Sequence, residues 1–318
     1  MRFNKLNIKY IFLLLLAASL TSFKLNTANF SETPIKRTYT LGYMKNIFSE
    51  VDINDARAAI KVLTDEIVRA YHYSDGYNLK AKIYGQCSDV TDSMKNDSLA
   101  VLSVNPYDYL TFGDKIGLDP ILVPCTKGDI FEQYSILTRK VSNFSNIKDL
   151  KGVKIGLLSS KNHIASRIWL DVLLAKNNIP DKSKFFNKIN TAEKESQLIL
   201  DLFFGHLDAC IVSTGALILM KELNPQVGEK LISIQNSPKY LWGMLCYTKI
   251  FTSEKDRNIF YTSARQVNGL NPGKQLFSLV KINKLEPFRY EYLNSFRDLL
   301  KEYNNDIKLK KLKNDDFD

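Results

Sequence analysis

Short apolar runs alternate with amphipathic segments along most of the chain. Four runs in its first part are predicted to form strands, at residues 39–43, 79–84, 99–104 and 120–124. The run at 99–104 is continuously apolar, as expected for a strand buried on both faces. Apolar positions from Ala56 to Ile67 recur with helical spacing, behind Asp52 or Asn54 as the cap. The alternation predicts an α/β fold with parallel strands.

A second unit with the same alternation begins near residue 133. Its expected strands are residues 134–138, 153–158 and 207–212, and its expected helices cover residues 164–175, 193–204 and 216–222. Gly205 is the stop signal of the second helix. An aromatic strand over 240–247 then returns to the first unit, and about three helices follow. This order predicts a discontinuous first domain, residues 38–133 with 246–318, joined to residues 134–245 by a two-stranded hinge.

Hydroxyl-rich turns follow two strands of the second unit. Ser159, Ser160 and Asn162 come after the strand at 153–158, and Ser213 and Thr214 come after the strand at 207–212. Such turns line the ligand crevice of an open α/β sheet. Each also precedes a helix, whose first N–H groups attract anions. The pattern therefore predicts a protein that holds a small molecule.

The N-terminus has the pattern of a secretory signal peptide. Arg2, Lys5 and Lys9 precede a ten-residue apolar run, Ile11–Leu20, which is shorter than the roughly 20 residues of a membrane helix. We expect a signal peptide over residues 1–28 and hence a secreted protein. Cleavage fits either the small residues near Ala17 or a site near Ala28, and an uncleaved anchor is the alternative.

Composition and charge narrow the class of protein. Of the 318 residues 45% are hydrophobic and 25% are charged, which is ordinary globular composition. The net charge of +10 is scattered along the chain without alternating with aromatic residues, so we expect no nucleic-acid partner and a mild attraction for anions. The four cysteines show no CxxC or metal-like spacing, and we expect mostly free, buried thiols and no cofactor.

Enzyme signatures are missing from the sequence. The three histidines, His72, His163 and His206, lack metal-ligand spacing, and there is no GxSxG elbow, phosphate-binding P-loop or GxGxxG motif. Ser160 and His163 form a conceivable nucleophile–base pair, but no orienting acid accompanies them. A binding protein is therefore favoured over an enzyme.

The order of several motifs resembles a known family over roughly residues 38–280. The best-matching motifs are Leu41-Gly42-Tyr43, residues 99–107, Gly117-Leu118-Asp119-Pro120, Tyr134-Ser135, Leu150-Lys151-Gly152, Phe185-Phe186 and Gly205 through Asp208-Ala209. In this order they resemble the periplasmic substrate-binding proteins of phosphate, phosphite and phosphonate ABC transporters, the PhnD-like family. The resemblance implies the type 2 fold: two lobes, each a mostly parallel sheet flanked by helices, with a two-stranded hinge.

The same resemblance implies the function. We expect a periplasmic monomer that captures a small oxyanion or zwitterion between its lobes and delivers it to an ABC transporter permease. The family's Ser-Thr-Ser-Gly run is replaced here by residues 162–165, so a different ligand, a sensing role in the envelope, and a degenerate binder remain alternatives.

The candidate ligand contacts are polar and lie at strand ends, helix starts and the hinge. They are Tyr43, Ser103, Asn105, Tyr107, Tyr134, Ser159, Ser160, Asn162, His163, Ser213 and Thr214. Alternative roles are capping for Ser159 and Ser160, lobe packing for Tyr43 and Tyr107, and a solvated helix position for His163. Asp208 is expected to brace the turn before its strand, and Arg167 to be solvated.

Overall fold

The structure, a computed structural model, describes residues 37–48, 51–70, 77–96, 99–158, 163–179, 182–249 and 253–315. The predicted signal peptide and its cleavage sites lie outside these ranges, as do Ser159, Ser160 and Asn162. Among the described helices none combines the length and the apolar character that crossing a membrane requires.

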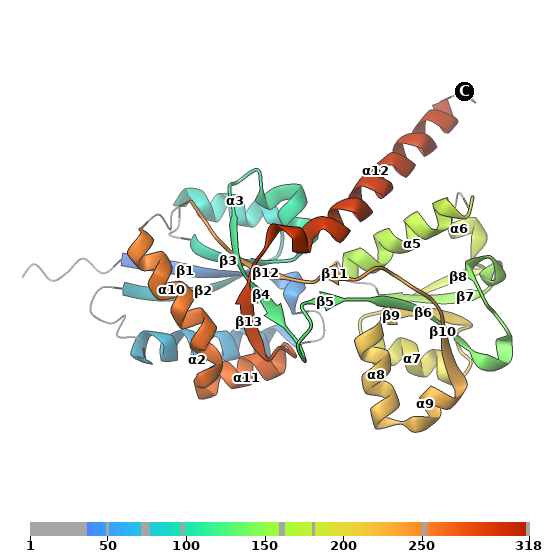
Figure 1. Cartoon of the computed structure of the whole chain (residues 1–318), viewed down its shortest axis with the longest axis horizontal. Helices are drawn as coiled ribbons and strands as arrows, with labels where there is room; N and C mark the ends of the chain where they lie inside the picture. Colours follow the sequence, from blue (N-terminus) through green and yellow to red (C-terminus); the bar gives the residue numbers. More distant parts are fainter. Residues whose placement is uncertain are drawn as a thin grey trace, which may run out of the picture.

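The first lobe is built on a six-stranded sheet in the order β13-β4-β12-β3-β1-β2 (Figure 1). Its strands are β1 (Arg37–Met44), β2 (Tyr77–Tyr84), β3 (Leu99–Val104), β4 (Asp119–Cys125), β12 (Met244–Tyr247) and β13 (Lys284–Pro287). Strand β3 lies between β1 and β12, which is why all six of its residues are buried. Strands β1, β2, β3 and β4 run one way, and β12 and β13 run the other.

Helices cover both faces of this sheet (Figure 1). They are α2 (Ile53–Ala70), α3 (Cys87–Asn96), the short α4 (Pro106–Asp108), a π-helical turn η3 (Tyr109–Gly113), α10 (Glu254–Gln266) and α11 (Asn271–Leu279). Asp52 caps α2 as expected, since its Oδ1 accepts from the backbone N of Asn54 at 2.8 Å. Ala56, Ile60 and Leu63 of α2 are buried, which confirms the predicted apolar face.

The second lobe is built on a five-stranded sheet in the order β10-β6-β9-β7-β8. Its strands are β6 (Tyr134–Arg139), β7 (Lys154–Leu158), β8 (Lys188–Ala192), β9 (Ala209–Ser213) and β10 (Leu231–Asn236). Its helices are α5 (Ile164–Lys176), α6 (Lys182–Phe185), α7 (Glu195–Phe203), α8 (Thr214–Leu223) and α9 (Pro225–Lys230), and it also contains the 3₁₀ turns η4 (Lys140–Ser142) and η5 (Ile147–Leu150). Only β6 opposes the common strand direction, so the predicted mostly parallel sheet is confirmed.

Two short strands connect the lobes. Strand β5 (Phe131–Glu132) pairs antiparallel with β11 (Tyr240–Leu241), between the two large sheets in Figure 1. The expected single aromatic strand over 240–247 is wrong in this detail. The chain leaves β11 at Trp242 and Gly243 and enters the first lobe's sheet as β12, because it changes sheets there.

The last helix of the chain is a third connection between the two lobes, in addition to strands β5 and β11. A 3₁₀ turn, η8 (Tyr290–Leu293), places Leu293 in the first lobe's core, and α12 (Asn294–Asp315) begins immediately after it. Phe296 and Leu299 of α12 are buried in the core of the second lobe, and Lys176 of α5 pairs with Glu302 at 2.8 Å. Figure 1 shows α12 running from the first lobe across to the α5 side of the second.

Candidate ligand site between the lobes

The carboxyl ends of β1 and β3 place three candidate residues together in the first lobe. Tyr43 and Ser103 are register partners on these parallel strands, and Asn105 follows β3. Ser103 and Asn105 are buried. The ring of Tyr43 packs 6.0 Å from that of Phe48, and burial raises the pKa of the Tyr43 phenol to about 12, so the phenol is a neutral O–H donor at pH 7.

Asn105 combines a capping role with an unused donor. Its Oδ1 accepts from the backbone N of Asp108 at 2.7 Å, which caps α4. Its Nδ2 is buried and has no hydrogen-bond partner among the described residues. Buried amide N–H groups are nearly always satisfied in folded proteins, so this donor indicates a place for water or ligand.

Asn46 is a neighbour of this group that sequence reasoning missed. It lies in the 3₁₀ turn η1 (Lys45–Ile47) directly after β1, and its Nδ2 donates to Asp108 Oδ2 at 2.7 Å. Its Oδ1 is also buried without a partner among the described residues. The sequence feature that could have identified Asn46 is its place just after a predicted strand. Asn105 likewise comes just after a predicted strand.

Tyr107 connects this group to the second lobe. The half-buried Tyr107 packs against the core cluster that contains Tyr134, Ile136 and Trp169 of the second lobe. Leu110 packs against the cores of both lobes. The carboxyl end of β3 is therefore in contact with the second lobe, as a site between the lobes requires.

In the second lobe, Tyr134 and His163 lie against each other. Their rings meet edge to face at 6.4 Å, and both residues are buried, so the solvated alternative for His163 is wrong. The Tyr134 hydroxyl donates to Glu132 Oε2 of β5 at 2.6 Å. Burial first, and then this carboxylate, raise the pKa of Tyr134 well above its ordinary value.

Ser213 and Thr214 are occupied by contacts within the second lobe. The Ser213 hydroxyl donates to Glu195 Oε2 at 2.9 Å and accepts from the backbone N of Ala216 at 3.1 Å, as the N-cap of α8. Thr214 Oγ1 lies 3.0 Å from Ser135 Oγ, which itself donates to Asn236 at 2.7 Å. Thr214 is therefore the donor in this pair. The hydroxyl protons of Ser213 and Thr214 are both used within the second lobe and are not free to bind an anion.

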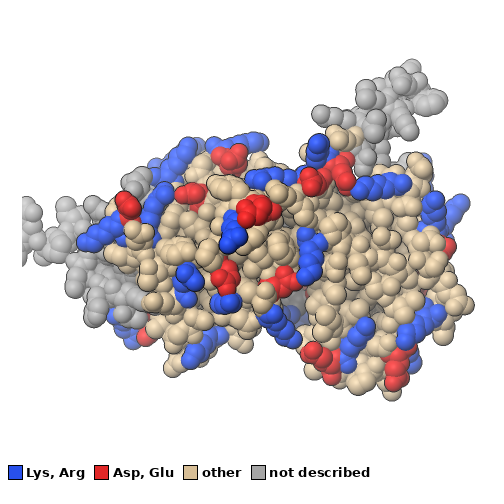
Figure 2. Space-filling view, viewed as in Figure 1, with Lys and Arg blue, Asp and Glu red and all other residues tan. Residues whose placement is uncertain are grey.

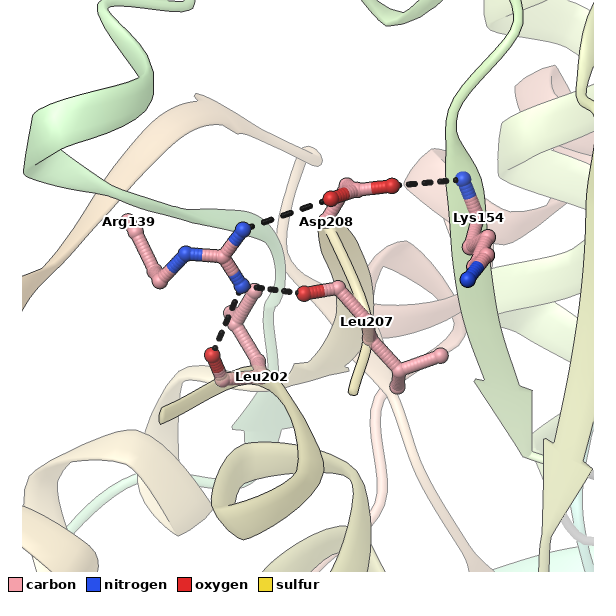
Figure 3. A network of polar contacts seen from close by, with 5 residues as sticks. All are labelled: Arg139, Lys154, Leu202, Leu207 and Asp208. Atoms are coloured by element: carbon pink, nitrogen blue, oxygen red, sulfur yellow. Dashed lines mark hydrogen bonds and ion pairs between the residues drawn. The ribbon is translucent and has the colours of Figure 1, made fainter. Parts of the chain in front are cut away.

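Asp208 braces the start of β9 as predicted (Figure 3). Its Oδ1 pairs with Arg139 Nη2 at 3.3 Å, and its Oδ2 accepts from the backbone N of Lys154 at 3.0 Å. Arg139 also donates to the carbonyls of Leu202 and Leu207. Both charged groups are used inside the second lobe, which leaves this network out of the ligand site.

Arg139→Met is expected to lower the free energy of unfolding by about 1–3 kcal/mol, because two carbonyls and one carboxylate lose a half-buried partner. Urea denaturation measures the change. The matched control is Lys61→Met, which removes an exposed pair with Asp65 and should cost less than about 1 kcal/mol. Equal losses in the two variants would contradict the structural role of the network.

Charge and thiol chemistry agree with the sequence expectations. Figure 2 shows basic and acidic side chains interspersed over both lobes on the face in view, rather than one basic patch. Arg167 is exposed. Cys125, Cys210 and Cys246 are buried free thiols and Cys87 is half-buried, and burial raises the pKa of Cys210 and Cys246. No group of three potential metal ligands occurs among the residues that the structure describes.

Solved structures with the same architecture come from several bacteria. A binding protein component of an ABC phosphonate transporter from Pseudomonas aeruginosa is 13% identical, with a TM-score of 0.61, and the match covers 86% of this chain and 89% of that one. PhnD1 from Prochlorococcus marinus, in complex with methylphosphonate, is 12% identical, with a TM-score of 0.59 over 84% and 98% of the two chains. At these identities the likeness shows the fold.

A third solved structure contains a different ligand. It is a Xanthomonas citri protein bound to ATP, which is 9% identical to this chain. Its TM-score is 0.63, and the match covers 87% of this chain and 99% of that one. A search of curated protein sequences gives no match. The profile of the family described as "ABC transporter, phosphonate, periplasmic substrate-binding protein" matches residues 48–261, more than half of the chain. The chain therefore belongs to the family of periplasmic substrate-binding proteins of phosphonate ABC transporters.

Proposed function

We propose that this protein captures a small anionic or zwitterionic ligand, a phosphonate- or phosphate-like oxyanion, between its lobes and delivers it to an ABC transporter permease. The observation that carries the proposal is Asn105, a 7% exposed residue whose amide N–H groups lack a partner among the described residues. It follows a strand at the carboxyl edge of a parallel sheet region, beside the contact of Tyr107 with the other lobe.

The proposed site is shared between the lobes because one lobe offers too few donors. Micromolar affinity requires about 8 kcal/mol. A hydrogen bond to a charged group supplies roughly 1.5–3 kcal/mol, so Asn105 and the neutral phenol of Tyr43 do not suffice. We propose that Ser103, Tyr107, Tyr134, His163 and the segment with Ser159, Ser160 and Asn162 complete the site when the lobes close.

The lobes are proposed to move about the β5–β11 connection. Residues 38–133 with 246–318 form one proposed body and residues 134–245 the other, although α12 packs on the second lobe. Hinge closure around a ligand is the usual motion of such receptors. We further propose a monomer that is exported by a signal peptide over residues 1–28.

A thermal-shift screen tests the proposed ligand class. Phosphate, phosphite, phosphonates, sulfonates and small organic cations are added separately to the mature chain. A ligand at about 100 times its dissociation constant stabilises the folded state by roughly 2.7 kcal/mol, so at least one phosphorus oxyanion should raise the melting temperature. If only organic cations raise it, the oxyanion assignment is wrong.

A further inference from the structure

Two amide atoms at the first lobe's sheet edge have no hydrogen-bond partner among the residues that the structure describes. Asn46 and Asn105 follow the neighbouring parallel strands β1 and β3, and both side chains bond to Asp108. The atoms left over are an acceptor, Asn46 Oδ1, and a donor, Asn105 Nδ2, and both are buried. Leaving a buried amide atom without a hydrogen-bond partner costs about 1–3 kcal/mol. A bound ligand that supplies these two partners would remove this cost.

Asp108 fixes which amide atom each side chain presents. Its carboxylate can only accept, so it holds the Asn46 Nδ2 at 2.7 Å and turns the Asn46 oxygen away. Its backbone N–H can only donate, so it holds the Asn105 oxygen at 2.7 Å and turns the Asn105 nitrogen away. Rotating either amide by 180° would replace a hydrogen bond with a repulsive contact.

The group lies where the lobes meet. Tyr107, between Asn105 and Asp108 in the chain, packs against the second lobe's core. A ligand bound at this edge of the first lobe's sheet would meet a fixed donor and a fixed acceptor. The donor suits an anionic oxygen, and the acceptor requires a hydrogen from the ligand. The Asp108 carboxylate beside them disfavours a fully ionised ligand.

We propose that Asn46 and Asn105, oriented by Asp108, recognise an oxyanion that retains one O–H group, with Asn46 Oδ1 accepting that hydrogen. The proposal rests on the proposed function and deepens it. Asn46 then selects a protonated phosphorus oxyanion over a sulfonate, because a sulfonate has no hydrogen to donate. A sulfonate would leave Asn46 Oδ1 buried and unsatisfied in the complex.

Calorimetric titration with two probes of equal charge tests the proposal. Methylphosphonate, at a pH where it is a monoanion, carries one O–H, and methanesulfonate carries none. The wild-type chain should bind methylphosphonate about 10- to 100-fold more tightly, since an unsatisfied buried acceptor costs roughly 1–3 kcal/mol. In Asn46→Leu, which lacks the acceptor, the preference should fall below about threefold.

The controls separate this proposal from the proposed function. Asn190→Leu removes another buried amide oxygen, on β8 of the second lobe, that has no hydrogen-bond partner among the described residues, and this variant should keep the wild-type preference. Asn46→Ala replaces Asn46→Leu if the larger side chain prevents folding. Equal binding of both probes by the wild type, or an unchanged preference in the Asn46 variants, would overturn the recognition proposal while the function stands. If the wild type binds no oxyanion at all, both proposals fail.

Discussion

Phe296→Ala is expected to lower the free energy of unfolding by about 3–5 kcal/mol. Phe296 is 2% exposed, and its ring meets that of Tyr240 at 5.8 Å in an edge-to-face contact. It anchors α12 in the core of the second lobe, three residues after Leu293, which is fully buried in the core of the first. Truncation would leave a cavity where the last helix joins the lobes.

The matched control for this substitution is Phe204→Ala. Phe204 is 66% exposed at the end of α7, so its truncation should change stability by no more than about 0.5 kcal/mol. Denaturant unfolding followed by circular dichroism measures both variants. A loss below about 1 kcal/mol in Phe296→Ala would mean that α12 does not dock on the second lobe in solution.

Asn105→Asp is expected to weaken oxyanion binding about 10- to 100-fold. Aspartate caps helices as well as asparagine does, so the bond from the Asp108 backbone N is retained. The amide donor is lost, however, and a negative charge replaces it. Loss of one hydrogen bond to a charged ligand costs roughly 1.5–3 kcal/mol, which corresponds to the stated change in the dissociation constant.

Asn224→Asp is the control for Asn105→Asp, with affinity measured by calorimetry and stability by thermal unfolding. Asn224 caps α9 in the second lobe through a 3.1 Å bond from the backbone N of Gln226. Its substitution makes the same chemical change at a cap away from the sheet edge, and should alter affinity by less than about twofold. Similar losses of affinity in both variants would point to a general effect of charge rather than to a contact of Asn105.

Central strands were predictable from the sequence, whereas of the four edge strands of the two large sheets only β2 was predicted, because its apolar and polar residues alternate. Strand β3 is apolar throughout because it lies inside a sheet with helices on both faces. Strands β8 and β13 lie at sheet edges, are partly exposed and contain several polar residues, so they lack a clear apolar pattern. Strand β10, the edge next to β6, was missed for the same reason.

The candidate site was predictable only where a residue carries a local signal. Asn105 precedes a proline in a helix-start pattern, and Asp208 follows a helix-stopping glycine. Asn46 has no such signal, because its partner Asp108 is 62 positions away and reaches it only when β1 and β3 pair. Ser213 resembled a ligand contact, but its hydroxyl donates instead to the buried Glu195 of α7, which is 18 positions away in the sequence.

A small oxyanion held between two lobes that close on it should make the molecule more compact. Small-angle X-ray scattering of the mature chain, without and with a saturating amount of the best oxyanion from the thermal-shift screen, measures this change. We predict a smaller radius of gyration in the presence of the ligand, because closure about β5–β11 brings the lobes together. An unchanged radius of gyration with the ligand demonstrably bound would contradict it.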